Sequence, residues 1–142
     1  MRERNASFVG ALLSERITLA TQLSVIPPYS SEDHQIANYG VGGQYGIHYD
    51  AFPFNSIFKN PEDGSQHKNK NVGMIHHTMD FMAFSGNRFA TFMAYLSDVQ
   101  AGGGTVFPAI GVNSAAKKGS ALFWLNLDNG NMNQNLATVH GG

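Results

Sequence analysis

Cysteine is absent from the 142 residues of the chain. This absence excludes a disulfide scaffold, a zinc site built on thiolates and a cysteine nucleophile. Charged residues are scarce, at 13% against about 25% in an average soluble protein. The formal net charge is −1, and no block of like charges could follow a phosphate backbone or an anionic membrane. We therefore expect neither a nucleic acid nor a membrane as a partner.

Long apolar runs are also missing. No stretch reaches the ~18 apolar residues of a membrane span, and residues 1–5 lack the apolar core of a signal peptide. The pattern Asn5-Ala6-Ser7 matches a glycosylation acceptor and is a weak pointer to the secretory pathway. The length and the 42% of apolar residues suit one folded domain that spans residues 1–142.

One helix is predicted near the start of the chain, because Val9, Leu13 and Ile17 recur at four-residue spacing. It should end near Leu23, ahead of Pro27-Pro28. One leading helix and many short strands with glycine turns predict a mainly β fold with a flanking helix, in the form of a sandwich or jelly roll. The strands are predicted at residues 34–39, 44–50, 88–99, 105–107, 121–126 and 136–140.

A long insertion loop is expected at residues 51–87, which show no sustained period and are rich in Asn, Lys and Gly. The loop includes His76, His77 and Asp80. His76 and Asp80 would share a face, as metal ligands at four-residue spacing do, only if their segment were helical. This set is a rival to the metal site described next.

His48 and Asp50 are two residues apart on a predicted strand, so both side chains should leave the same face. His140, at the end of the last predicted strand, is the natural third ligand. Two imidazoles and one carboxylate form the facial triad of non-haem Fe(II) oxygenases, which leaves coordination positions open. The spacing alone equally fits a surface pair or a hydrogen-bonded histidine.

Five sequence blocks extend this interpretation beyond the ligands. They are NYGVGGQYGIHYD at 38–50, GNRFAT at 86–91, YLSDV at 95–99, GGGTVFP at 102–108 and KGSALFWLN at 118–126. In this order, over roughly residues 10–140, the chain closely resembles the catalytic domain of animal prolyl 4-hydroxylases. The resemblance implies a double-stranded β-helix (jelly roll) core that uses Fe(II), 2-oxoglutarate as co-substrate and L-ascorbate as reductant. It also implies procollagen-type peptidyl-proline as substrate and the lumen of the endoplasmic reticulum as location, and it allows for a partner subunit.

The resemblance assigns a role to each of seven residues. Three would be metal ligands, two would hold 2-oxoglutarate and two would line the groove for a collagen-like peptide. In that order these are His48, Asp50 and His140; Tyr39 and Thr105; and Tyr45 and Arg88. The residue types alone leave a structural role open for the last four, because a core tyrosine or a β-branched strand residue needs no ligand.

The sequence departs from the family after the distal histidine. The family continues with a strand that bears a lysine for the far carboxylate of 2-oxoglutarate, whereas this sequence stops at Gly142, and neither Lys117 nor Lys118 matches that lysine. We therefore expect a C-terminally incomplete dioxygenase domain with poor turnover. The alternative is a non-catalytic fragment or paralogue that acts as a peptide-binding or partner subunit.

Overall fold

The computed structural model describes residues 2–53, 86–128 and 133–142. The chain divides into two compact units, Met1–Asn38 and Tyr39–Gly142. Most of the predicted insertion loop, with the rival metal set His76, His77 and Asp80, lies outside the described residues. Whether the whole chain forms one domain stays a prediction.

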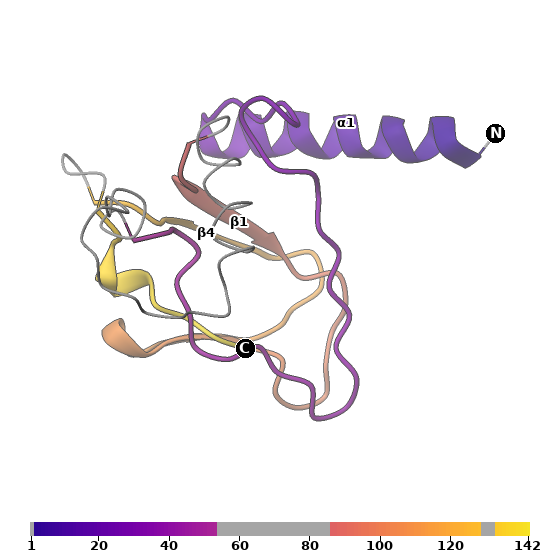
Figure 1. Cartoon of the computed structure of the whole chain (residues 1–142). Helices are drawn as coiled ribbons and strands as arrows, with labels where there is room; N and C mark the ends of the chain where they lie inside the picture. Colours follow the sequence, from indigo (N-terminus) through magenta and orange to yellow (C-terminus); the bar gives the residue numbers. More distant parts are fainter. Residues whose placement is uncertain (1, 54–85, 129–132) are drawn as a thin grey trace, which may run out of the picture. The chain divides into compact units, whose positions relative to one another are not determined.

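The first unit is built on α1 (Arg2–Thr21) (Figure 1). The predicted helix is confirmed, although it ends two residues before Leu23. Gln22 adopts a left-handed conformation with φ of 61°, and the Thr21 hydroxyl accepts the N–H of Leu23 at 3.2 Å, so the helical ladder stops there. Across the described ranges, no helix combines the length and apolar character that a bilayer crossing requires.

The predicted strand at 34–39 is wrong. Within the described part of the chain, these residues form no strand pairing and are exposed, with Ile36 78% accessible. His34 turns back to the helix instead, where its Nε2 lies 3.1 Å from the Ser14 hydroxyl. Apolar β-formers alone therefore do not make a strand when no neighbouring strand offers hydrogen bonds.

The second unit contains two antiparallel strand pairs. β1 (Ala90–Ala94) pairs with β4 (Ala121–Leu125), and β2 (Thr105–Phe107) pairs with β3 (Val112–Ser114). The predictions at 105–107 and 121–126 are confirmed, and the one at 88–99 is confirmed over β1 only. η1 (Pro108–Ile110) connects β2 to β3, which the sequence did not predict.

The C-terminal residues 140–142 lie between two other segments. On one side His140 pairs with His48, and on the other Gly141 pairs with Val106 of β2. Tyr45 exchanges both backbone hydrogen bonds with Gly142, at 2.5 and 3.0 Å. One extra residue lies on the Tyr45–His48 side between these pairs, which is the pattern of a β-bulge. The predicted strand at 44–50 is thus reduced to these pairings.

The predicted strand at 136–140 is wrong over its first three residues, which form the 3-10 helix η2 (Leu136–Thr138). The Asn135 side chain accepts the N–H of Ala137 at 3.1 Å, and the Thr138 hydroxyl donates to the Asn135 carbonyl at 2.8 Å. These local side-chain bonds favour a turn over an extended strand.

The core of the second unit lies between the two sets of strands. Phe107 of β2 meets Trp124 of β4 edge to face, with ring centroids 5.3 Å apart. Leu127 and Ala51 of the same unit are also buried, at 2% and 3% exposure. The regular elements in the described part of this unit are strands and short 3-10 turns, and the first unit contains one helix, so the mainly β expectation is confirmed at this level. The flanking position of the helix stays a prediction.

Candidate metal centre

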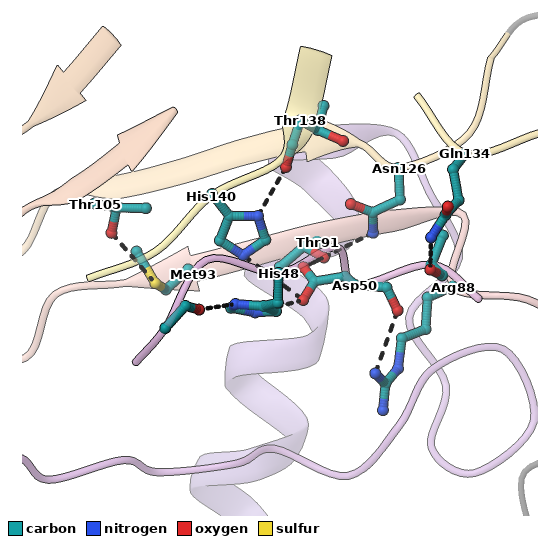
Figure 2. A network of polar contacts seen from close by, with 12 residues as sticks. His48, Asp50, Arg88, Thr91, Met93, Thr105, Asn126, Gln134, Thr138 and His140 are labelled. Atoms are coloured by element: carbon teal, nitrogen blue, oxygen red, sulfur yellow. Dashed lines mark hydrogen bonds and ion pairs between the residues drawn. The ribbon is translucent and has the colours of Figure 1, made fainter. Parts of the chain in front are cut away.

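Three donor atoms converge in the second unit (Figure 2). His48 Nε2 lies 3.4 Å from Asp50 Oδ1, and His140 Nε2 lies 3.7 Å from the same oxygen. All three atoms are within 4.8 Å of one another. Ligands at about 2.1 Å from a common metal must approach each other to roughly 3–4 Å, so this group has the dimensions of a metal site.

The backbone sets the distance between the two histidines. The His48 N–H donates to the His140 carbonyl at 2.8 Å, and the His140 N–H donates to the His48 carbonyl at 3.0 Å. Residues opposite each other in an antiparallel pair project their side chains to the same face. The two imidazole rings accordingly lie with centroids 4.3 Å apart.

The second nitrogen of each ring fixes its tautomer. His48 Nδ1 lies 2.8 Å from the Gly46 carbonyl, and His140 Nδ1 lies 2.8 Å from the Thr138 carbonyl. A carbonyl oxygen only accepts, so each neutral ring must carry its proton on Nδ1. Both Nε2 lone pairs are then available toward Asp50, which is how metal-ligating histidines are held in place.

The surroundings differ between the two histidines. His140 is 6% exposed and is packed by aromatic rings, with Trp124 at 4.9 Å and Phe107 at 5.5 Å between centroids. The His48 side chain is 30% exposed, and among the described residues its close ring contacts are His140 at 4.3 Å and the edge-on ring of Tyr45 at 4.2 Å. The site is therefore more accessible beside His48 than beside His140.

A set of polar contacts holds the segment that carries Asp50. Thr91 donates to Asp50 Oδ2 at 2.5 Å, and Arg88 donates to the Asp50 carbonyl at 3.3 Å. The Asn87 amide bonds both the N–H and the carbonyl of Phe52, each at 2.9 Å. Because three side chains near the start of β1 bond residues 50–52, the carboxylate has a defined direction.

Sequence reasoning missed Thr91, Asn87 and, beyond them, Asn126, whose amide donates to the Thr91 hydroxyl at 2.8 Å. All three residues lie in the blocks GNRFAT and KGSALFWLN. The blocks thus include these three residues. Their sequence positions, however, do not indicate which side chains or backbone groups they bond.

The structure brings two of the four other predicted site residues to the triad. Tyr45 contacts His48, and Arg88 bonds the Asp50 backbone and lies over the Phe52 ring at 5.2 Å. Tyr39 is 54% exposed, and no hydrogen bond or ring contact joins it to the triad within the described residues. Thr105 is buried, and its hydroxyl accepts from Tyr95 at 2.8 Å. The roles predicted for all four stay predictions.

Comparison with known proteins gives a consistent set of relatives, although no protein-family model matches the chain. Prolyl 4-hydroxylase subunit alpha-2 of Gallus gallus is 40% identical over 121 residues, which cover 84% of this chain and 18% of that protein. Subunit alpha-1 of Homo sapiens is 39% identical over 113 residues, which cover 79% of this chain and 17% of that protein. Human subunit alpha-3 is 37% identical over 117 residues, which cover 81% of this chain and 17% of that protein.

These matches confirm the resemblance read from the five sequence blocks. The chain spans less than a fifth of the length of these curated relatives. Among solved structures, the viral collagen prolyl hydroxylase of Paramecium Bursaria Chlorella virus-1, in its 2OG complex, matches with a TM-score of 0.49 and 25% identity. That match covers 73% of this chain and 45% of the viral chain.

Proposed function

We propose, from the premise that this chain is homologous to prolyl 4-hydroxylase alpha subunits, that it carries the metal centre of an Fe(II)- and 2-oxoglutarate-dependent dioxygenase acting on peptidyl proline. The observation that carries the proposal is the convergence of His48, Asp50 and His140 within 4.8 Å. Two neutral imidazoles and one carboxylate are the donor set of non-haem Fe(II) oxygenases. The described residues supply three donors, which leaves positions for co-substrate and dioxygen.

Bound iron would supply the oxygen chemistry, in which 2-oxoglutarate is oxidised to succinate and carbon dioxide while the proline ring gains a hydroxyl. The chain's own residues hold the three candidate metal ligands and orient their donor atoms. The Gly46 and Thr138 carbonyls keep both Nε2 atoms unprotonated toward the centre, and Thr91 fixes the carboxylate. Trp124 and Phe107 pack against His140 and exclude water from that side.

The fold that we propose for the second unit is the double-stranded β-helix. Two hydrogen-bonded strand sets that pack through Phe107 and Trp124 support it. So does the position of His48 and His140 on adjacent strand segments, since strands from separate parts of the chain must meet at such a site. In this fold residues 1–142 would form one domain, with 51–87 as an insertion.

The exposed surface beside His48 is our candidate for the peptide-binding site. Tyr45 is 55% exposed and its ring meets His48 at 4.2 Å, so an aromatic surface for a proline ring adjoins the metal centre. A polyproline II peptide has free carbonyls, which the Arg88 guanidinium beside Asp50 could bind. We assign Tyr39 and Thr105 to 2-oxoglutarate; Thr105 lies on β2, the strand that pairs with residues 140–142.

Homology alone supports three further elements of the proposal. They are L-ascorbate as reductant, the lumen of the endoplasmic reticulum as location, and a partner subunit. The acceptor pattern at Asn5 is compatible with that location.

The proposal is tested by incubating the chain with Fe(II), 2-oxoglutarate, ascorbate, dioxygen and a (Pro-Pro-Gly)-repeat peptide. We expect 4-hydroxyproline in the peptide, detected by mass spectrometry and amino-acid analysis, together with succinate. Neither product should form with the His48→Ala variant or without 2-oxoglutarate. Peptide binding without either product would contradict the proposed hydroxylase activity and favour a non-catalytic, peptide-binding subunit.

A further inference from the structure

We propose that Thr91 and Asn126 are positioning residues which hold Asp50 as a one-oxygen metal ligand. The inference rests on the metal centre proposed above and adds two residues that touch no metal themselves. They act through a chain of hydrogen bonds from Asn126 to Thr91 and from Thr91 to Asp50, which Figure 2 shows beside the two histidines.

The strand register brings the two residues together. Thr91 of β1 stands opposite Trp124 of β4, and Asn126 follows two residues after Trp124. The Asn126 N–H continues the ladder by donating to the Phe89 carbonyl at 2.8 Å. Thr91 and Asn126 are therefore diagonal neighbours across the strand pair, a separation that polar side chains can bridge.

Each hydrogen bond in this chain has a definite direction. A carboxylate accepts only, so the single hydroxyl hydrogen of Thr91 goes to Asp50 Oδ2, at 2.5 Å. The Thr91 oxygen must then accept, and the Asn126 amide nitrogen donates to it at 2.8 Å. A Thr91 oxygen that accepts from the amide is better able to donate to Asp50, since hydrogen bonds in a chain polarise one another.

The two oxygens of Asp50 consequently have different roles. Oδ2 is bound by Thr91, whereas Oδ1 lies nearest to the histidines, 3.4 Å from His48 Nε2 and 3.7 Å from His140 Nε2. If both oxygens turned to the metal, the carboxylate would occupy one more coordination position. Thr91 thus keeps open a position that a co-substrate could use.

The burial of Asn126 argues for a specific use of its amide. The residue is 2% exposed, and within the described residues its Oδ1 is buried without a hydrogen-bond partner. An apolar side chain of similar size would avoid that unsatisfied acceptor. Donation from Nδ2 to Thr91 accounts for an amide at this position, whereas core packing does not.

The test measures the binding of Co(II) alone to the full chain, by calorimetry and by the visible absorption of the bound ion. Thr91→Val removes the hydroxyl at almost constant shape, Thr91→Ser restores it, and Asn126→Leu removes the amide. Thr21→Val is the matched control, because it deletes a threonine hydroxyl bonded to the Ile17 carbonyl in the first unit. Thermal melting of each metal-free variant reports changes in stability separately.

We expect Thr91→Val to weaken Co(II) binding by about 10- to 100-fold, the range found for outer-shell partners of metal ligands, and to change the Co(II) spectrum. Thr91→Ser and Thr21→Val should keep a Co(II) affinity within about 3-fold of the parent chain and the parent's Co(II) spectrum. The Co(II) affinity of Asn126→Leu should lie between that of the parent and that of Thr91→Val. Should Thr91→Val not fold, the affinity and spectrum of Asn126→Leu decide alone. Parent-like affinity and spectrum in Thr91→Val, or failure of Thr91→Ser to restore them, would overturn the inference.

The outcome is separable from that of the proposed function. Suppose that the parent chain binds Co(II), that Thr91→Val weakens this binding, and that the parent chain hydroxylates no peptide. This result would support the positioning role of Thr91 and Asn126 and refute the proposed prolyl hydroxylase activity. A parent chain that binds no Co(II) would refute both.

Discussion

His48 and His140 face each other across one antiparallel bridge, in which each residue donates its N–H to the other's carbonyl, at 2.8 and 3.0 Å. The separation of the two imidazoles is therefore a property of the backbone pairing, before any metal binds. Asp50 lies just beyond this bridge, and its orientation depends on Thr91 of β1 and on Arg88, which precedes that strand. The candidate site thus combines a main-chain frame for two ligands with a side-chain frame for the third.

Replacement of Asp50 by Asn should cost more metal affinity than any outer-shell change. The variant keeps the shape of the side chain but removes the anionic donor, so Co(II) or anaerobic Fe(II) binding should weaken by at least about 100-fold, as measured by calorimetry. Asp98→Asn is the control, because Asp98 is exposed and, within the described ranges, its side chain accepts a hydrogen bond from the N–H of Lys118 alone, at 2.9 Å. Equal losses in the two variants would argue against a metal role for Asp50.

The single tryptophan should report on the metal. Trp124 is the chain's one Trp and its ring lies 4.9 Å from that of His140, so bound Co(II) should quench its emission through short-range contact. Zn(II) is the control ion, because its filled d shell lacks the electronic states that quench. Saturable Co(II) binding with unchanged emission would mean that the metal sits elsewhere.

Asn87→Ala should destabilise the segment that carries Asp50. The substitution removes both hydrogen bonds to the Phe52 backbone, each 2.9 Å long, and leaves partly buried groups unpaired. We expect a loss of about 1–3 kcal/mol in the free energy of unfolding, measured by urea denaturation, together with weaker metal binding. Asn113→Ala, at an exposed position, should change neither quantity. Unchanged stability in Asn87→Ala would show that the two hydrogen bonds from Asn87 to Phe52 do not stabilise this segment.

Gly141→Ala should disturb the bridge itself. A Cβ at this position would lie 2.9 Å from Ile47 Cδ1 and 3.0 Å from the Tyr45 carbonyl oxygen, closer than side chains tolerate. We expect overpacking to cost about 1–3 kcal/mol of stability and to displace His48 or His140, with reduced Co(II) affinity. Gly40→Ala is the matched control, since its Cβ would meet open space. A Gly141→Ala variant as stable as the control would show that the close approach is relieved at no cost.

The sequence indicates which three candidate donors lie together better than it indicates the elements that carry them. His48 and Asp50 were paired on the assumption of a regular strand, yet Asp50 lies outside the bridge and reaches the site because Thr91 and Arg88 hold it. His140 was identified as an isolated polar residue after apolar ones. Its pairing with His48 depends on a bulge that no residue type in the segment specifies.

The misses have physical causes that a single sequence does not reveal. Thr138 and Val139 are β-branched and favour a strand, but the side chain of Asn135 bonds the backbone two residues ahead and favours a 3-10 turn. Asn126 was part of a recognised block, and its use depends on the register of β1 against β4, which places it diagonally to Thr91. Register is set by the whole pairing rather than by local composition.

The bridge between His48 and His140 joins positions about 90 residues apart, so it closes most of the chain into one loop. Closing a flexible loop of that length costs about 4 kcal/mol of chain entropy, from (3/2)RT ln n. An ion held by both histidines and by Asp50 acts as a removable cross-link on that loop, because the unfolded chain presents no such preformed site. Metal loading should therefore stabilise the distant ends of this unit as strongly as the site, and a chelator should loosen residues 140–142 first.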